Sequence, residues 1–171
     1  MNALSHAART SSGLECAFLI RDLRATQIPA CESFFNRLDP RDVRMRFATL
    51  RFCDRYFIPS LGGASDGLAL AAIQEADTIV GVANLVPMAA GKAEAAVIVR
   101  SDLKRRGIGR TLIAAVIDRA ERLGLRQIMG LVNSENYPML ALARSMGFQL
   151  VRWDSYLTEV RRVVARGADV K

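Results

Sequence analysis

The feature that most constrains this chain is the segment VIVRSDLKRRGIGR, residues 97–110. A run of β-branched residues ends there in a basic turn with two glycines, and the turn leads into the helical pattern of residues 108–123. The first backbone N–H groups of a helix have no intrahelical acceptor and lie at the positive end of the helix dipole. Gly107 and Gly109 leave the main chain open to a ligand. The segment therefore predicts an anion site, with a pyrophosphate as its ligand.

Two common phosphate-binding motifs do not match this turn. A P-loop needs Lys and Ser or Thr directly after its glycines, whereas Arg110 and Thr111 follow here. A dinucleotide-binding turn needs a third glycine, and Ile113 occupies that position. A helix start with a solvated basic loop is the alternative to a ligand site.

Hydrophobic periodicity predicts one domain with the element order β-α-α-βββ-α-β-α-ββ. The expected strands are residues 16–23, 68–75, 78–86, 93–100, 126–132, 148–154 and 156–164. The expected helices are residues 26–37, 40–50, 108–123 and 134–146, with a short helical piece at 54–61. Short links make the strands between 68 and 100 an antiparallel meander, and a helix crossover makes 126–132 parallel to 93–100. The fold class is α+β, a three-layer arrangement with helices on both faces of a mostly antiparallel sheet.

The ends of the chain have no clear hydrophobic periodicity. We expect residues 1–14 to be a disordered leader, 15–164 the single domain and 165–171 a flexible tail. The leader lacks the apolar core of a signal peptide, and no apolar run approaches the ~20 residues of a membrane span. Hydrophobic residues make up 51% and charged residues 24% of the chain, as in globular domains.

Cysteine and histidine usage restricts the chemistry. Cys16, Cys31 and Cys53 are odd in number and lack metal-ligand spacing, so we expect free thiols in a reducing, cytoplasmic compartment. The single histidine, His6, lies in the leader, which excludes a His-based zinc site and a Ser-His-Asp triad. We expect no bound metal.

The stretch KRRGIGRTLI, the strand after it and NSENYPMLALARSMGF together resemble the acetyl-CoA-binding half of the GNAT N-acetyltransferase superfamily. The family signature is Gln/Arg-x-x-Gly-x-Gly/Ala, then a strand, an Asn that opens a helix, and Gly-Phe. It falls on Lys104, Gly107, Gly109, Asn136 and residues 147–148, with Lys104 where Gln or Arg is usual. The resemblance implies that the parallel pair 93–100 and 126–132 splays apart at the centre of the sheet.

The same resemblance implies how acetyl-CoA would bind. Its pyrophosphate would contact the backbone N–H groups of the turn, and the cations of the turn would add charge: Lys104, Arg105, Arg106, Gly107, Ile108, Gly109 and Arg110. The backbone of Val97, Ile98 and Val99 would hold the acetyl oxygen and the pantetheine amides. Asn136 would contact the pantetheine arm; alternatively it caps the helix, a role that Ser134 could also fill.

Acetyl transfer needs a neutral amine. For a lysine with a pKa near 10.4, deprotonation at pH 7 costs about 4.6 kcal/mol, so a nearby carboxylate is useful as a base. Glu94 matches the Glu of the Ala-Glu-x-Ala-Val pattern in the GNAT branch that acetylates protein lysines. The alternative is an exposed carboxylate paired with Lys92 or Arg100.

The general acid of many GNAT enzymes is missing. The tyrosine that stands four residues before the Gly of Gly-Phe in those enzymes is Ala143 here. Tyr137 is either a packing residue of the first helical turn or a substitute acid. A thiol pKa near 8.5 also allows the thiolate to leave without assistance.

The segment LRATQIPACESFFNRLDPRDVRMRF resembles the start of the protein-lysine-acetylating branch at Leu38, Pro40 and the pair 46–47. This predicts an acetyl-CoA-dependent transferase acting on a protein lysine, for example of an acyl-CoA synthetase. A small-molecule amine acetyltransferase and a non-catalytic acyl-CoA sensor stay open, as do a monomer and a homodimer.

Basic residues of the same region predict the kind of acceptor. The resemblance to GNAT folds implies that Arg41, Arg44, Arg51 and Arg55 lie at least partly around the amine entrance, where they would suit an acidic protein surface. The net charge of +7 also raises nucleic-acid binding, but the arginines and aromatics between 37 and 57 follow helical spacing, which disfavours it.

Overall fold

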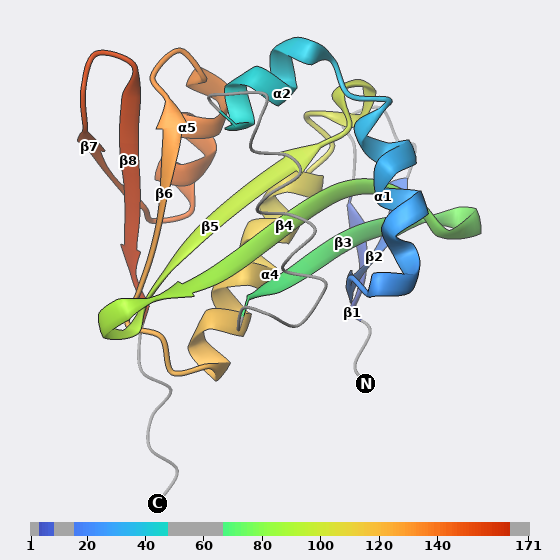
Figure 1. The fold of residues 1–171 in the computed structure, drawn as a ribbon, viewed down its shortest axis with the longest axis horizontal. Coiled ribbons are helices and arrows are strands. Elements are labelled where there is room, and N and C mark those ends of the chain that lie inside the picture. Colours follow the sequence, from blue (N-terminus) through green and yellow to red (C-terminus); the bar gives the residue numbers. More distant parts are fainter. Residues whose placement is uncertain (1–3, 9–15, 48–66, 165–171) are drawn as a thin grey trace, which may run out of the picture.

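The computed structural model of the chain describes residues 4–8, 16–47 and 67–164. The expected piece 54–61, the end of the expected helix 40–50, and Arg51 and Arg55 lie outside the described residues. Strands β1 to β8 form one sheet in the order β1-β2-β3-β4-β5-β6-β8-β7 (Figure 1). Their bounds are β1 Leu4–Ala8, β2 Cys16–Asp22, β3 Leu68–Gln74, β4 Thr78–Met88, β5 Lys92–Val99, β6 Gln127–Asn133, β7 Gln149–Arg152 and β8 Leu157–Val163.

Four α-helices and four short 3₁₀ turns connect the strands within the described ranges. The helices are α1 Ile28–Phe35, α2 Pro40–Phe47, α4 Ile108–Arg122 and α5 Tyr137–Ser145. The 3₁₀ turns are η1 Ala25–Gln27, η4 Glu75–Asp77, η5 Ala89–Gly91 and η6 Ser101–Leu103. None of the described helices is long and apolar enough to cross a bilayer.

The expected sheet arrangement is confirmed. Strands β3, β4 and β5 form the antiparallel meander, and β5 and β6 are parallel neighbours across the α4 crossover. The expected disordered leader needs a correction, because Leu4–Ala8 form β1 and pair antiparallel with β2. Without β1 the strand β2 would end the sheet with unpaired backbone groups, which pairing satisfies.

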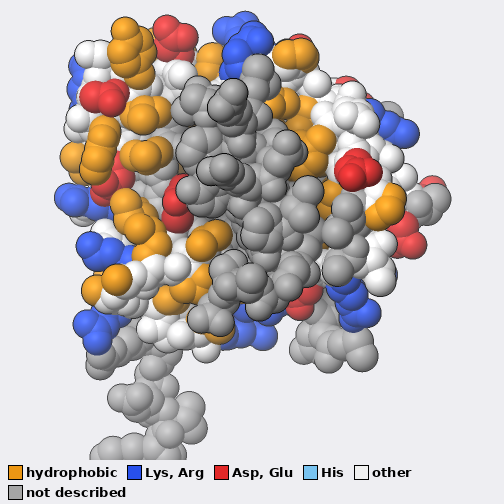
Figure 2. Space-filling model, in the orientation of Figure 1, with side chains coloured by type: hydrophobic (Ala, Val, Ile, Leu, Met, Phe, Trp, Pro, Cys, Tyr) orange, Lys and Arg blue, Asp and Glu red, His pale blue; other side chains and the backbone are white. Residues whose placement is uncertain are grey.

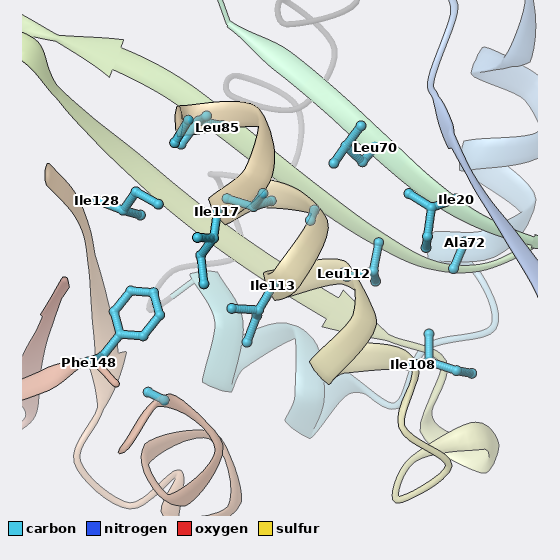
Figure 3. Packing of buried hydrophobic residues seen from close by; sticks show 14 of the residues in the cluster. Ile20, Leu70, Ala72, Leu85, Ile108, Leu112, Ile113, Ile117, Ile128 and Phe148 are labelled. Atoms are coloured by element: carbon cyan, nitrogen blue, oxygen red, sulfur yellow. The ribbon is translucent and has the colours of Figure 1, made fainter. Parts of the chain in front are cut away.

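The sheet separates two hydrophobic clusters. On one face Cys31 and Phe34 of α1, with Leu38 from the loop after it, pack against residues of β3 and β4 such as Ala71 and Val82. On the other face α4 packs against β3, β4 and β5 (Figure 3). Its buried residues are Ile108, Leu112, Ile113, Val116, Ile117 and Ala120. Leu123, the C-cap of α4 that precedes the left-handed Gly124, lies outside this buried face and is 53% exposed.

Cys31 is a core residue without reactive character. Its thiol is buried against the sheet, and burial, with a smaller effect of the Glu32 charge, raises its pKa to about 11. A thiol with this pKa is almost fully protonated at pH 7 and is a poor nucleophile.

Candidate active site

The parallel strands β5 and β6 part in the middle of the sheet. Along their described length they pair at three positions, with Lys92, Ala93 and Glu94 opposite Gln127, Ile128 and Met129. Past this point each strand continues while paired on its other edge only, with β4 or with β8. A gap therefore opens in the sheet directly after Glu94. This is the separation of the two parallel strands that the family resemblance implied.

Gly130 lies where the strands separate. A Cβ atom built on Gly130 would be 2.7 Å from the carbonyl oxygen of Ala95, which is backbone and cannot rotate away. The close approach explains why glycine occupies an otherwise apolar strand, and a lone glycine within a strand pattern is the sequence signal that could have indicated it.

Replacement of Gly130 by Ala tests this contact. We expect loss of about 1–3 kcal/mol in the free energy of unfolding, because the strands must shift to remove the overlap. Urea denaturation of Gly130→Ala beside Gly109→Ala measures it; the Cβ at Gly109 would be at ordinary contact distance, 3.5 Å from Leu142 and 3.6 Å from Val99. A stability equal to that of the unmodified protein would show that the strands do not approach as described.

The backbone of β5 alternates between its two neighbours. The N–H of Arg100 donates to Val80 O on β4 at 2.9 Å, whereas the carbonyl of Ala95 faces β6. Because backbone groups alternate in direction along a strand, those of Val97 and Val99 face the gap. The expectation for Ile98 is corrected: its carbonyl lies toward Gly81 of β4.

The basic turn after β5 has the shape of an anion cradle. Arg105 and Gly107 both have left-handed backbone conformations, with φ of 65° and 82°. Gly107 is the N-cap of the 15-residue helix α4. No described residue accepts a backbone hydrogen bond from the N–H of Ile108, Gly109 or Arg110. Free N–H groups at the start of a long helix, with alternating backbone handedness before it, favour anion binding.

The basic side chains of the turn differ in their exposure and in the partners that they contact. Arg105 is exposed, and Arg106 is half-buried. The guanidinium of Arg110 donates to Ser145 Oγ at 2.8 Å and lies 3.1 Å from Met146 Sδ, so it joins the start of α4 to the end of α5. Lys104 forms an ion pair with Asp42 of α2, a partner that its expected role as a phosphate cation did not include.

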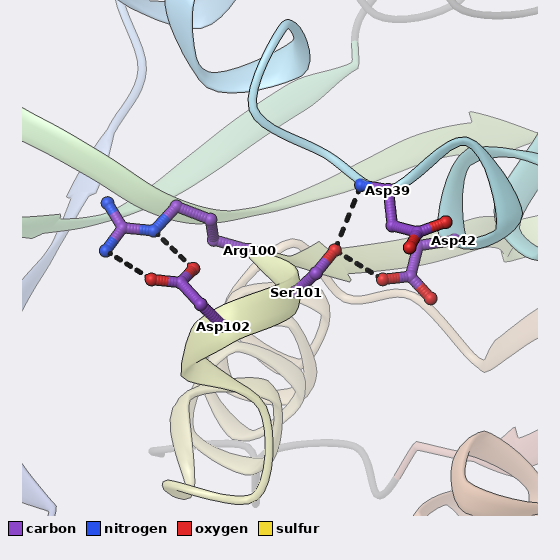
Figure 4. A network of polar contacts seen from close by, with 5 residues as sticks. All are labelled: Asp39, Asp42, Arg100, Ser101 and Asp102. Carbon is purple, nitrogen blue, oxygen red and sulfur yellow. Dashed lines mark hydrogen bonds and ion pairs between the residues drawn. The ribbon is translucent and has the colours of Figure 1, made fainter.

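Polar contacts join the turn η6 to α2 (Figure 4). Ser101 Oγ donates to Asp42 Oδ2 at 2.5 Å and accepts the N–H of Asp39 at 3.1 Å. Beside it, Arg100 donates to both carboxylate oxygens of Asp102 at 2.7 and 3.1 Å, and these hydrogen bonds lower the pKa of Asp102. The sequence carried no sign of this network, since its halves lie about sixty positions apart.

Glu94 lies at the last paired position of β5, where the gap begins. Ala93 and Leu85 pack on the α4 side of the sheet, so the alternation of the strand turns Glu94 toward the α1 and α2 side. The side chain is exposed, and the expected pair with Lys92 or Arg100 is not formed. Within the described ranges Glu94 has no ion-pair partner, which leaves its carboxylate able to accept a proton.

The structure shows which contacts the candidate residues in and before α5 make. Asn136 is the N-cap of α5, and its Oδ1 accepts the N–H of Met139 at 3.2 Å, which is the capping alternative. The Nδ2 group of Asn136 makes no contact of its own in the described structure. Tyr137 is 73% exposed and does not pack in the first turn, whereas Ala143 is buried. Ser134 bonds Thr158 and does not cap α5.

The described residues contain no group of three or more His, Cys, Asp or Glu side chains placed to hold an ion.

Known proteins share this fold. Residues 21–148 match the model of the acetyltransferase (GNAT) family. The GNAT domain of PAT from S. lividans has a TM-score of 0.79 at 16% identity, over 94% of this chain and 96% of that chain. Ribosomal-protein-alanine N-acetyltransferase from Brucella melitensis has a TM-score of 0.67 at 23% identity, over 84% and 98%. The Salmonella typhimurium protein yncA, solved with its cofactor acetyl-CoA, has a TM-score of 0.68 at 20% identity, over 88% and 96%.

Proposed function

The chain belongs to the acetyltransferase (GNAT) family, whose enzymes use acetyl-CoA, and we propose that it acetylates lysine ε-amines of proteins with Glu94 as general base. The observation that carries the proposal is the position of Glu94. It is an exposed carboxylate without an ion-pair partner among the described residues, at the point where β5 and β6 separate and on the sheet face that carries α2. A base at this point lies beside the gap and on the opposite sheet face from α4, whose start would bind the phosphates.

The groups around the gap fit an elongated phosphate-bearing ligand. The N–H groups of Ile108, Gly109 and Arg110 would hold the pyrophosphate of acetyl-CoA, with the exposed Arg105 beside them. The backbone of Val97 and Val99 would pair with the pantetheine arm as a neighbouring strand does. The N–H groups of the turn would donate hydrogen bonds to the phosphates, and the free N–H and C=O groups of β5 would pair with the amides of the pantetheine arm.

The acetyl thioester supplies an activated acyl group with a thiolate leaving group. Glu94 accepts a proton from the lysine ammonium, directly or through a water molecule. A backbone N–H of β5 that faces the gap donates to the acyl oxygen as it becomes negative. A carbon–nitrogen bond forms, the carbon–sulfur bond breaks, and the electron pair leaves on sulfur. The nitrogen of the new amide then releases its second proton to water. With Ala143 at the usual acid position, the thiolate leaves unprotonated and takes its proton from water.

The surface of α2 supports a protein acceptor. Helix α2 contacts both β5 and β6, its Asp42 accepts a hydrogen bond from Ser101 just after β5, and its Arg41 and Arg44 are exposed. In Figure 2, which has the orientation of Figure 1, blue Lys and Arg side chains lie around the margins of this side of the molecule. Exposed basic residues near the gap would attract an acidic protein surface around the target lysine, whereas they would repel a polyamine.

Isotopically labelled acetyl-CoA, incubated with the protein and a proteome extract, tests the proposal. Mass spectrometry should find labelled N-ε-acetyllysine on a restricted set of proteins, above the level of an enzyme-free control. Label on small amines alone would replace the protein acceptor by a small molecule. Tight binding of acetyl-CoA without any transfer would make the chain a sensor.

Charge reversal on α2 tests the acceptor surface. The double variant Arg41→Glu and Arg44→Glu should raise the KM for a protein acceptor several-fold and flatten its dependence on salt, because exposed charges act on encounter. The kcat and the Kd for acetyl-CoA should stay within about twofold, since exposed rim charges act mainly on association. The matched control reverses the exposed Arg21 and Arg126, which lie on β2 and before β6. Equal effects of the two double variants would remove α2 from the acceptor site.

A further inference from the structure

A small apolar cavity lies beside the gap between β5 and β6. Its volume is about 40 Å³, and its lining includes Ala95, Val97, Met129, Met139, Ala143 and Phe148. Every lining side chain among the described residues is apolar. Apolar cavities of this kind stay dry and take apolar groups, and about 40 Å³ is room for one or two methylene-sized groups.

The cavity belongs to the reaction end of the gap. Ala95 directly follows Glu94, and Met129 is the residue paired with Glu94 across the strands. The floor comes from Ile113 of α4 and Phe148 after α5, which project toward the same region in Figure 3. A group in this cavity would therefore lie beside the strand positions that flank Glu94, on the α4 and α5 side of the gap.

Small side chains create the space. Ala95 and Ala143 face each other from the sheet and α5, and Ala143 is only 1% exposed. A longer side chain at either position would fill the volume. Since the interior of a protein is close-packed, an unfilled apolar volume at a binding site is a specific local feature.

We propose that this cavity accepts the hydrocarbon chain of an acyl group longer than acetyl, so that the enzyme also transfers propionyl or butyryl from the corresponding acyl-CoA. The inference rests on the proposed transferase function, and the bonds formed and broken are those of acetyl transfer. Acyl groups with a terminal carboxylate, such as succinyl, are excluded, because the apolar lining has no partner for a buried charge.

The kcat/KM values for acetyl-, propionyl-, butyryl- and succinyl-CoA, with one lysine peptide, test the cavity. The unmodified protein should use propionyl-CoA about as well as acetyl-CoA and succinyl-CoA at least 100-fold less. Ala143→Leu should lower the propionyl-to-acetyl ratio by about 10-fold or more, the range for one methylene in an apolar pocket. The control is Ala141→Leu, the same change on the exposed side of α5.

The outcomes separate this inference from the proposed function. A ratio unchanged in Ala143→Leu, with acetyl transfer intact, would overturn the acyl cavity alone. An equal fall for all acyl-CoA species would assign the cavity to the pantetheine arm. Should Ala143→Leu fail to fold, Val160→Ile adds a single methyl to the same lining and should shift the ratio in the same direction. If no acyl group is transferred, calorimetric Kd values for the same acyl-CoA series replace kcat/KM. The preference for propionyl-CoA over acetyl-CoA should then fall in Ala143→Leu, and an unchanged preference would overturn the acyl cavity.

Discussion

Glu94→Gln should lower the kcat of acetyl transfer at pH 7 by about 10²-fold or more while the Kd for acetyl-CoA stays the same. The amide has the shape of the carboxylate but cannot accept the amine proton. The pH profile should change as well: with the base removed, the rate should rise with pH toward the pKa of the amine, about 10.4 for lysine. Stopped assays with a lysine peptide and calorimetric titration of acetyl-CoA measure the two quantities.

A matched control for Glu94→Gln is Glu121→Gln, an exposed carboxylate on α4 on the opposite side of the sheet from α2. It should change neither kcat nor Kd. Equal rates in Glu94→Gln and the unmodified protein would show that the base lies elsewhere.

Gly107→Ala should weaken acetyl-CoA binding by about 10- to 100-fold, the effect of losing one or two hydrogen bonds to a charged phosphate. Gly107 has a φ of 82°, a conformation that an L side chain adopts at a cost of about 1–2 kcal/mol. Relief of that strain would turn the N–H groups at the start of α4 away from their common point. Calorimetry measures the Kd, and thermal unfolding measures the stability.

The control for Gly107→Ala is Gly124→Ala, at the other end of the same helix. Gly124 has a φ of 66° and open space around its Cα, so the backbone strain is similar while no ligand group is near. Both variants should lose similar stability, and only Gly107→Ala should lose affinity. If both retain the affinity of the unmodified protein, the turn does not bind the phosphates.

Most of the fold could be predicted from the sequence, because the hydrophobic patterns of its strands and helices involve residues that are close together in the chain. The alternation of β3 to β5 and the 3.6-residue period of α4 depend on neighbouring residues, and their positions agree with the structure to within one or two residues. The strand β1 was missed because its sequence, LSHAA, lacks a hydrophobic alternation; its partner β2 determines it.

The site was predictable only as far as its motifs are contiguous. The glycine-containing turn and Glu94 lie on one segment, so a single pattern located both. The pairing of Lys104 with Asp42, the direction of the Ile98 backbone and the approach of Gly130 to Ala95 depend on contacts between elements. No spacing rule contains this information, and only the folded sheet provides it.

Amide signals of the ¹⁵N-labelled 18.8 kDa protein, followed during titration with acetyl-CoA, test most directly the claim that the gap holds the coenzyme. The N–H groups of Val97, Val99, Gly107, Ile108, Gly109 and Arg110 should shift strongly and become protected from hydrogen exchange. The N–H of Ile98, directed to β4, should gain little protection. Changes confined to other surfaces, or protection of Ile98 in place of Val97 and Val99, would contradict the account.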